Sequence, residues 1–173
     1  VGDATLLMNQ SIASLVQTLS GLLEKSSIKI ALAESCTGGL LAAHLTAQAG
    51  SSLWFDRGFV TYSNASKTES IGVSSSIIEQ YGAVSEEVAK AMAQGALNHS
   101  AAKTSIAITG IAGPGGSTEN KPVGMVCFAW AVQFPGSPAL LIASTQIFDG
   151  DRQAIREHAC AYALNELIQI LRK

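Results

Sequence analysis

The stretch IKIALAESCTGG, residues 28–39, decides the fold class of this 173-residue chain. Its first six residues are apolar apart from one lysine and begin with β-branched isoleucines, which is typical of a buried strand. Two glycines then lead into an apolar segment that Gly50 ends, so a helix follows the strand. A buried strand that passes directly into a helix indicates parallel strands covered by helices.

The same alternation continues on both sides of this stretch. Three polar residues, Asp3, Ser85 and Asp151, stand where a helix N-cap is expected. The predicted helices cover 4–25, 37–50, 64–82 in short pieces, 86–98 and a C-terminal segment after Asp151, and the further predicted strands cover 59–63, 104–110, 123–133 and 139–148. The order of elements is therefore α-β-α-β-α-α-β-β-β-α.

A Pro-Gly connection, FPGSP at 134–138, separates the last two predicted strands and favours a hairpin. At least one antiparallel strand therefore joins an otherwise parallel sheet. The predicted fold class is α/β: a three-layer α/β/α sandwich on a mixed, mostly parallel sheet of about five strands. The sequence has no repeat, low-complexity tract or linker, so residues 1–173 are expected to form a single domain.

Composition excludes several classes of protein. Hydrophobic residues make up 47% of the chain and charged residues 14%, which excludes an intrinsically disordered chain. The formal net charge of −2 provides no basic excess for nucleic acid or a membrane surface, and no run of about 20 apolar residues predicts a membrane span. The chain begins without the basic region of a signal peptide, so we expect a cytoplasmic protein.

Three cysteines, Cys36, Cys127 and Cys160, are odd in number and far apart, which argues against disulfides and fits a reducing cytoplasm. The three histidines are equally scattered, and neither HExxH nor a CxxC pair occurs. We therefore expect no metal site.

Ser35 stands where the first strand ends and its helix begins, at the edge of the sheet where open α/β folds bind ligands. A serine here can act as a nucleophile, with nearby amide N–H groups as an oxyanion hole. The alternative interpretation is purely structural: Ser35 or Thr37 only caps the helix. Cys36 is a rival nucleophile if the helix start lowers the pKa of its thiol, and otherwise a small buried hydrophobe.

Three further clusters carry polar side chains. Lys67 lies five residues after Tyr62, and a partly buried lysine near a serine can serve as a general base, whereas an exposed one is only a solvated charge. The glycine-rich loop after Thr109 either cradles a ligand or is a tight connection, and it matches no nucleotide-binding fingerprint. Arg152 at a helix start suits an anionic ligand, or is a plain surface residue.

These segments together resemble the CinA C-terminal domain family over residues 6–170. The resemblance is carried, in order, by AESCTGG (33–39), GFVTYSNASK (58–67), GAVSEEVA (82–89), TGIAGPGG (109–116) and KPVG (121–124). Members include bacterial nicotinamide-nucleotide amidases, which hydrolyse nicotinamide mononucleotide (NMN) to nicotinate mononucleotide and ammonia in pyridine-nucleotide salvage. The resemblance implies no cofactor. Many relatives carry a preceding domain, and this chain looks like the stand-alone form.

Carried over position by position, the resemblance implies Ser35 as the nucleophile, Lys67 as the general base and Tyr62 as the residue that orients or relays the proton. The substrate-binding residues that it implies are Thr37, Gly38, Gly39, Asn64, Thr109, Gly110 and Arg152. Amides near Thr37 and Gly38 are expected to stabilise the oxyanion. Two groups are candidates for binding the substrate phosphate, namely the glycine-lined helix start and Arg152. Ser117 replaces the second glycine of many relatives, so the loop is expected to differ slightly.

Two other functions stay open from sequence alone. One is a non-catalytic pyridine-nucleotide sensor with the same pocket, and the other is a competence or DNA-damage module, against which the net charge of −2 speaks. The aromatic residues Trp54, Phe55 and Phe59 belong either to the core or to a subunit contact. Since family members commonly self-associate, the resemblance implies a homodimer.

Overall fold

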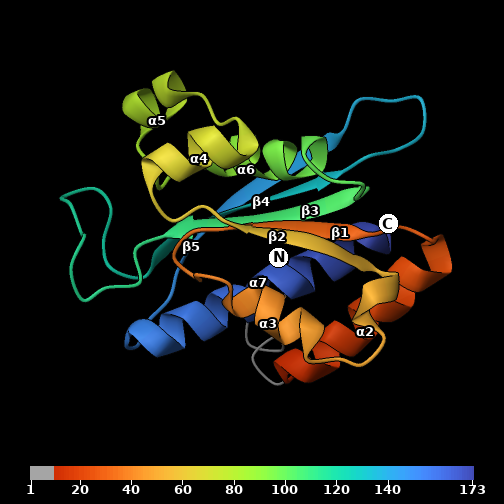
Figure 1. Ribbon diagram of the computed structural model, residues 1–173. Coiled ribbons are helices and arrows are strands. Elements are labelled where there is room, and N and C mark those ends of the chain that lie inside the picture. Colours follow the sequence, from red (N-terminus) through yellow and green to blue (C-terminus); the bar gives the residue numbers. More distant parts are fainter. Residues whose placement is uncertain (1–9) are drawn as a thin grey trace.

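The computed structural model describes residues 10–173 and places a five-stranded sheet between two layers of helices (Figure 1). The strands are β1 (Ile30–Glu34), β2 (Phe55–Val60), β3 (Thr104–Gly110), β4 (Met125–Val132) and β5 (Leu140–Ile147). The helices are α2 (Ile12–Ser26), α3 (Leu40–Thr46), the short 3₁₀ turn η1 (Ser51–Leu53), α4 (Asn64–Ile71), α5 (Ser75–Tyr81), α6 (Glu86–Asn98) and α7 (Arg152–Leu171). Helices α4, α5 and α6 lie on one side of the sheet, and α2, α3 and α7 lie on the other.

The strand order is β2-β1-β3-β4-β5, which confirms the predicted α/β class and the mixed sheet. Strand β1 pairs in parallel with both β2 and β3, and β4 runs antiparallel to its neighbours β3 and β5. The chain leaves β1 through α3 on one face, and it returns to β3 from β2 through α4, α5 and α6 on the other face. The carboxyl end of β1 is therefore the switch point at which α/β sheets form ligand sites.

The two faces of the sheet bury side chains of different size. Ile30 and Leu32 of β1 join the large residues packed under α2, α3 and α7, whereas Ala31 and Ala33 meet the alanine-rich face of α6. This alternation follows from the two-residue period of a strand. It places the side chains of Glu34 and Ser35, the next two residues, on opposite sides of the sheet.

Several boundaries differ from the prediction, and each has a local cause. Strand β2 begins earlier than residue 59 because Phe55 already pairs with Ile30, and it ends before 63 because Ser63 serves as the N-cap of α4. Helix α2 begins at Ile12 with Ser11 as its N-cap, and the predicted cap Asp3 lies outside the described residues. The predicted caps Ser85 and Asp151 are confirmed, as is the hairpin of β4 and β5.

Trp54 is fully buried, and Phe55 is half-buried against the same core cluster, whereas Phe59 is half-buried against the cluster on the other face of the sheet. Of the two interpretations, core or subunit contact, the burial of Trp54 supports the core. Within residues 10–173, no helix has the length and apolar character needed to cross a membrane.

Candidate active site

Ser35 and Lys67 meet at the carboxyl ends of β1 and β2. Ser35 directly follows β1, and Lys67 lies near the start of α4, which begins four residues after the last residue of β2. The Nζ atom of Lys67 lies 3.1 Å from the Oγ atom of Ser35. The fold thus joins two residues that stand 32 positions apart in the sequence.

Lys67 is a buried lysine held by main-chain oxygens. Its side chain is 1% exposed, and Nζ donates to the carbonyl of Thr61 at 2.8 Å and to that of Tyr62 at 3.3 Å. Among the described residues it forms no ion pair with a carboxylate. Burial lowers the pKa of Lys67 from its ordinary value of 10.5, because removal from water penalises the ammonium form.

These contacts define what a neutral Lys67 does. A neutral amine has two N–H groups and one lone pair, and carbonyl oxygens only accept hydrogen bonds. If the two N–H groups stay on Thr61 and Tyr62, the lone pair faces the third neighbour, the hydroxyl of Ser35. The two carbonyls therefore orient the base toward the nucleophile.

Ser35 is anchored through its main chain. Its N–H donates to the carbonyl of Ile108 at 2.9 Å, which extends the pairing of β1 with β3 by one residue. Its Oγ also lies 3.4 Å from the carbonyl oxygen of Tyr62, longer than an ordinary hydroxyl hydrogen bond. Ser35 is 8% exposed.

Cys36, the rival nucleophile, behaves as a hydrophobe. Its side chain belongs to the core cluster beneath α3 and α7, and burial raises the pKa of the thiol to about 12. At neutral pH almost none of it is thiolate, the form that attacks carbonyls. The main-chain N–H of Cys36 has no main-chain acceptor in the described part of the chain.

The loop after β1 is a glycine turn that leads into α3. Gly38 and Gly39 have φ values of +57° and +97°, a region that side chains other than glycine rarely adopt. The N–H of Gly38 donates to the carbonyl of Ser35 at 3.0 Å. That amide closes the turn and is not free for an oxyanion, contrary to the expectation for Gly38.

Thr37 and Thr109 do not line an accessible surface. They are 0% and 1% exposed, so both are covered by neighbouring residues in this structure, and their assignment as substrate-binding residues stays a prediction. The Thr37 carbonyl accepts from Arg156 at 2.8 Å, and within residues 10–173 its hydroxyl has no partner. The Thr109 hydroxyl donates to the carbonyl of Ala83 at 2.8 Å, which connects β3 to the segment between α5 and α6.

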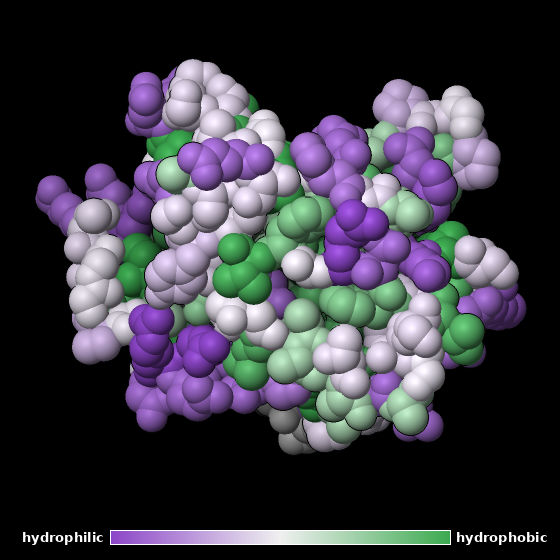
Figure 2. All heavy atoms as spheres, in the orientation of Figure 1, coloured by the Kyte–Doolittle hydropathy of each residue, from purple (hydrophilic) through white to green (hydrophobic). Residues whose placement is uncertain are grey.

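Tyr62 and Arg152 form a bridge beside the dyad. Tyr62 is 59% exposed, and its hydroxyl accepts from Arg152 at 3.0 Å rather than touching Ser35 or Lys67. Arg152 also donates to the carbonyl of Gly113 at 2.8 Å, so it links the loops that follow β2 and β3 to the start of α7. Figure 2 shows hydrophilic side chains gathered over the beginning of α7. Near the dyad, Tyr62 contributes its carbonyl and not its phenol.

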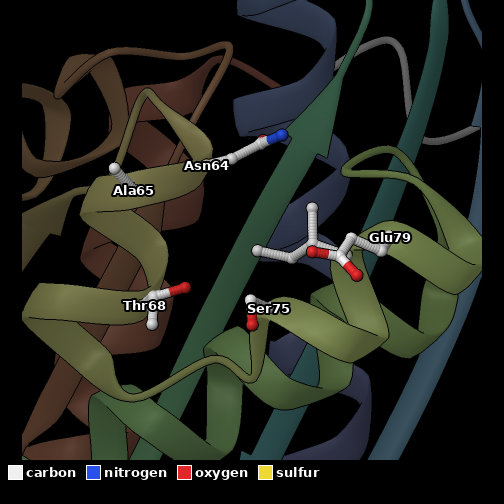
Figure 3. A pocket seen from close by; sticks show the side chains of 6 residues that line it. Asn64, Ala65, Thr68, Ser75 and Glu79 are labelled. Carbon is white, nitrogen blue, oxygen red and sulfur yellow. The ribbon is translucent and has the colours of Figure 1, made fainter.

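The remaining predicted residues have other neighbours. Gly110 packs against β4, where an added Cβ would stand 2.8 Å from Val126. Asn64 borders a hollow of about 190 Å³ between α4 and α5, with Thr68, Ser75 and Glu79 around it (Figure 3). Neither Ser35 nor Lys67 lines this hollow.

Sequence reasoning missed Glu34, whose buried carboxylate lies beside the nucleophile turn. It accepts from the N–H groups of Gly39 and Leu41 at 3.1 Å each and of Ala42 at 2.8 Å. The sequence does contain a sign of this role, because an acidic residue at the end of an apolar strand, before two glycines, needs buried hydrogen-bond donors. These contacts occupy three of the N–H groups at the start of α3.

The sequence and the fold of this chain are similar to those of known proteins. The family model for the CinA C-terminal domain matches residues 12–171. A nicotinamide-nucleotide amidohydrolase PncC from Enterobacter agglomerans is 49% identical over 140 residues, covering 81% of this chain and 83% of that protein. The protein of the same name from Escherichia coli K12 is 44% identical over 163 residues, covering 94% of this chain and 96% of the relative.

A longer relative and a solved structure show the same similarity. A CinA-like protein from Mycolicibacterium paratuberculosis is 52% identical over 143 residues, which cover 83% of this chain and 33% of that protein. The crystal structure of the competence damage-inducible protein A from Klebsiella pneumoniae matches with a TM-score of 0.89 and 33% identity, covering 94% of this chain and 98% of that one. With a family model spanning nearly all of the described residues and relatives this similar, the chain belongs to the CinA C-terminal domain family.

Proposed function

We propose that this protein is an amidohydrolase that cleaves the carboxamide of NMN, giving nicotinate mononucleotide and ammonia. The observation that carries the proposal is the buried contact of 3.1 Å between Lys67 Nζ and Ser35 Oγ. Relatives named nicotinamide-nucleotide amidohydrolase support the class of enzyme and of substrate.

The first chemical step is deprotonation of the nucleophile. Neutral Lys67 takes the proton of the Ser35 hydroxyl, and Oγ attacks the carboxamide carbon. The lowered pKa of Lys67 makes the neutral form available closer to neutral pH than for an exposed lysine. The pyridinium ring of NMN is positively charged, so a neutral lysine beside it also avoids charge repulsion.

The tetrahedral intermediate then collapses. The N–H of Cys36, the residue after the nucleophile, is free of main-chain acceptors among the residues described and is our candidate oxyanion donor, a role that this position has in other serine hydrolases. The Lys67 ammonium returns its proton to the departing nitrogen, and ammonia leaves. A nicotinoyl ester remains on Ser35 Oγ.

Hydrolysis of the ester repeats the same proton transfers with water. Lys67, neutral again, takes a proton from water, whose oxygen attacks the ester carbon. The proton then passes to Ser35 Oγ as the bond to the nicotinate carbonyl breaks. The same lysine therefore serves as base and acid in both halves of the reaction.

The phosphate of NMN is assigned to Arg152. The amides at the start of α3 are bonded to Glu34. Arg152 is exposed, lies next to Tyr62 and belongs to the hydrophilic start of α7. Its planar guanidinium suits a phosphate, because it offers several N–H donors in one plane.

The test is ammonia release from NMN by the purified chain and two neighbouring variants. We expect turnover by the wild type, loss of turnover with retained NMN binding in Ser35→Ala, and turnover close to wild type in Cys36→Ala. Binding without ammonia release in the wild type would identify a sensor instead. An active Ser35→Ala beside a dead Cys36→Ala would reassign the nucleophile to the thiol.

A further inference from the structure

Glu34 is a buried charge that the proposed proton transfers do not use. It ends β1, is 1% exposed, and forms no ion pair among the residues that the structure describes. Its partners are three main-chain N–H groups: Oε2 accepts from Gly39 and Leu41, and Oε1 accepts from Ala42. A buried carboxylate with three donors is stably held, since each charge-assisted bond offsets part of the lost hydration.

The position of Glu34 follows from strand geometry. Successive side chains of a strand point to opposite faces, so Glu34 faces α3 while Ser35 faces α4 and Lys67. The carboxylate therefore reaches from the end of β1 to the first turn of α3. The loop that it spans, residues 35–38, contains the nucleophile.

Besides the bonds to Glu34, this loop has main-chain bonds from the N–H groups of Ser35 and Gly38 and one side-chain bond from Arg156. Gly38 and Gly39 both adopt positive φ, and glycine has more backbone freedom than any other residue. Helix α3 has only seven residues, and its N-cap Gly39 provides no side-chain cap. So short a helix needs an external partner for its free N–H groups. Glu34 is that partner, and it joins the rigid strand to the helix across both glycines.

We propose that Glu34 is a positioning residue for Ser35: its carboxylate holds the start of α3 against β1 and so fixes the loop in which Oγ faces Lys67. This inference rests on the proposed amidohydrolase function and adds a residue to it. A displacement of a reacting atom by about 1 Å costs on the order of 100-fold in rate. Loss of the carboxylate is therefore expected to lower kcat, while KM for NMN changes little because Glu34 touches no exposed surface.

The experiment compares two substitutions of Glu34 with a control. Glu34→Gln keeps the shape but leaves at least one of the three N–H groups facing an amide NH₂, so we expect kcat to fall about 10-fold. Glu34→Ala removes all three bonds, and the expected fall is about 100-fold or more. The control is Thr104→Val, which removes a buried 3.0 Å bond to the carbonyl of Ala131 at the opposite end of β3. It should lower the unfolding midpoint and leave kcat unchanged.

A second readout makes the test independent of the substrate. Labelling of Ser35 by a fluorophosphonate, followed by mass spectrometry, measures the reactivity of Oγ directly and should slow in the same order as kcat. Wild-type protein that labels but releases no ammonia from NMN would overturn the proposed substrate, and the labelling rates would still test Glu34. A folded Glu34→Gln or Glu34→Ala variant that labels and turns over within twofold of wild type would overturn the positioning role. So would wild-type protein whose Ser35 does not label, or equal losses in Thr104→Val.

Discussion

Replacing Lys67 with methionine removes the buried amine while it keeps a side chain of similar length. In the wild type the amine contacts Ser35, Thr61 and Tyr62 within 3.3 Å. If Lys67 is the general base, its loss is expected to cost 10²- to 10⁴-fold in kcat, about 3–5 kcal/mol. Lys67→Arg should lose nearly as much, because a guanidinium with a pKa above ~12 cannot accept the proton.

The same substitution has a signature in stability. The folded-state pKa of Lys67 lies below its unfolded value of 10.5, so between these two pH values the folded protein binds fewer protons than the unfolded chain. The free energy of unfolding of the wild type therefore rises with pH in this window, by at most about 1.4 kcal/mol per pH unit from this group. Below the folded pKa both states are protonated, and the native state bears the cost of a buried ammonium. Lys67→Met lacks this dependence.

Urea denaturation of both proteins at several values from pH 6 to 10 measures the difference, in which the other ionisations largely cancel. We expect the wild type to gain stability relative to Lys67→Met as the pH rises. The wild-type kcat/KM should rise through an ionisation in the same pH range. A stability difference that stays constant over the whole range would refute a lowered pKa, and Lys67→Arg with wild-type kcat would refute the base.

Two further predictions concern packing and the thiols. Gly95→Ala on α6 would bring its Cβ into a clash with the carbonyl oxygen of Ile71 at the end of α4, so we expect a loss of about 1–3 kcal/mol in unfolding free energy. Gly115→Ala, whose Cβ meets nothing within 4 Å, is the neutral control in the same denaturation assay. Alkylation at pH 8 should leave the native thiols unmodified and modify all three in urea, and rapid native labelling of Cys36 would contradict its burial. The three buried thiols are Cys36, Cys127 and Cys160.

Much of the fold is readable from sequence because it depends on local rules. Strand β3 and the caps at Ser85 and Asp151 follow directly from apolar runs and hydroxyl or carboxylate positions. The prediction placed the second strand too late in the sequence. Strand β2 lies at the edge of the sheet, where charged residues such as Asp56 and Arg57 are tolerated, so its first half lacks the apolar pattern of a strand. Tertiary pairing with β1, and not local pattern, sets where β2 begins.

The site was only partly readable for a related reason. Sequence reasoning finds polar residues at strand ends, and the family resemblance names Ser35 and Lys67, whose side chains lie 3.1 Å apart in the structure. It does not reveal whether a polar residue faces solvent or the interior. Thr37 and Thr109 are buried, the Thr109 hydroxyl donates to the carbonyl of Ala83, and the Tyr62 phenol accepts from Arg152 of a distant helix. Glu34 went unnoticed because its partners are main-chain amides, so its position between an apolar strand and two glycines is the only sign of it in the sequence.

The dyad is held mainly by the backbone. Main-chain carbonyls of residues just past β2 orient Lys67, and a main-chain bond to β3 holds Ser35. These groups exist whatever the side chains are, but they converge only at the end of β1, where the crossovers to β2 and β3 pass on opposite faces. Because successive side chains alternate between the two faces of the sheet, Ser35 points toward α4 and Glu34 points toward α3. A one-residue shift of register in β1 would exchange these faces and separate nucleophile from base, so the pairing of β1 with its neighbours is itself part of the catalytic geometry.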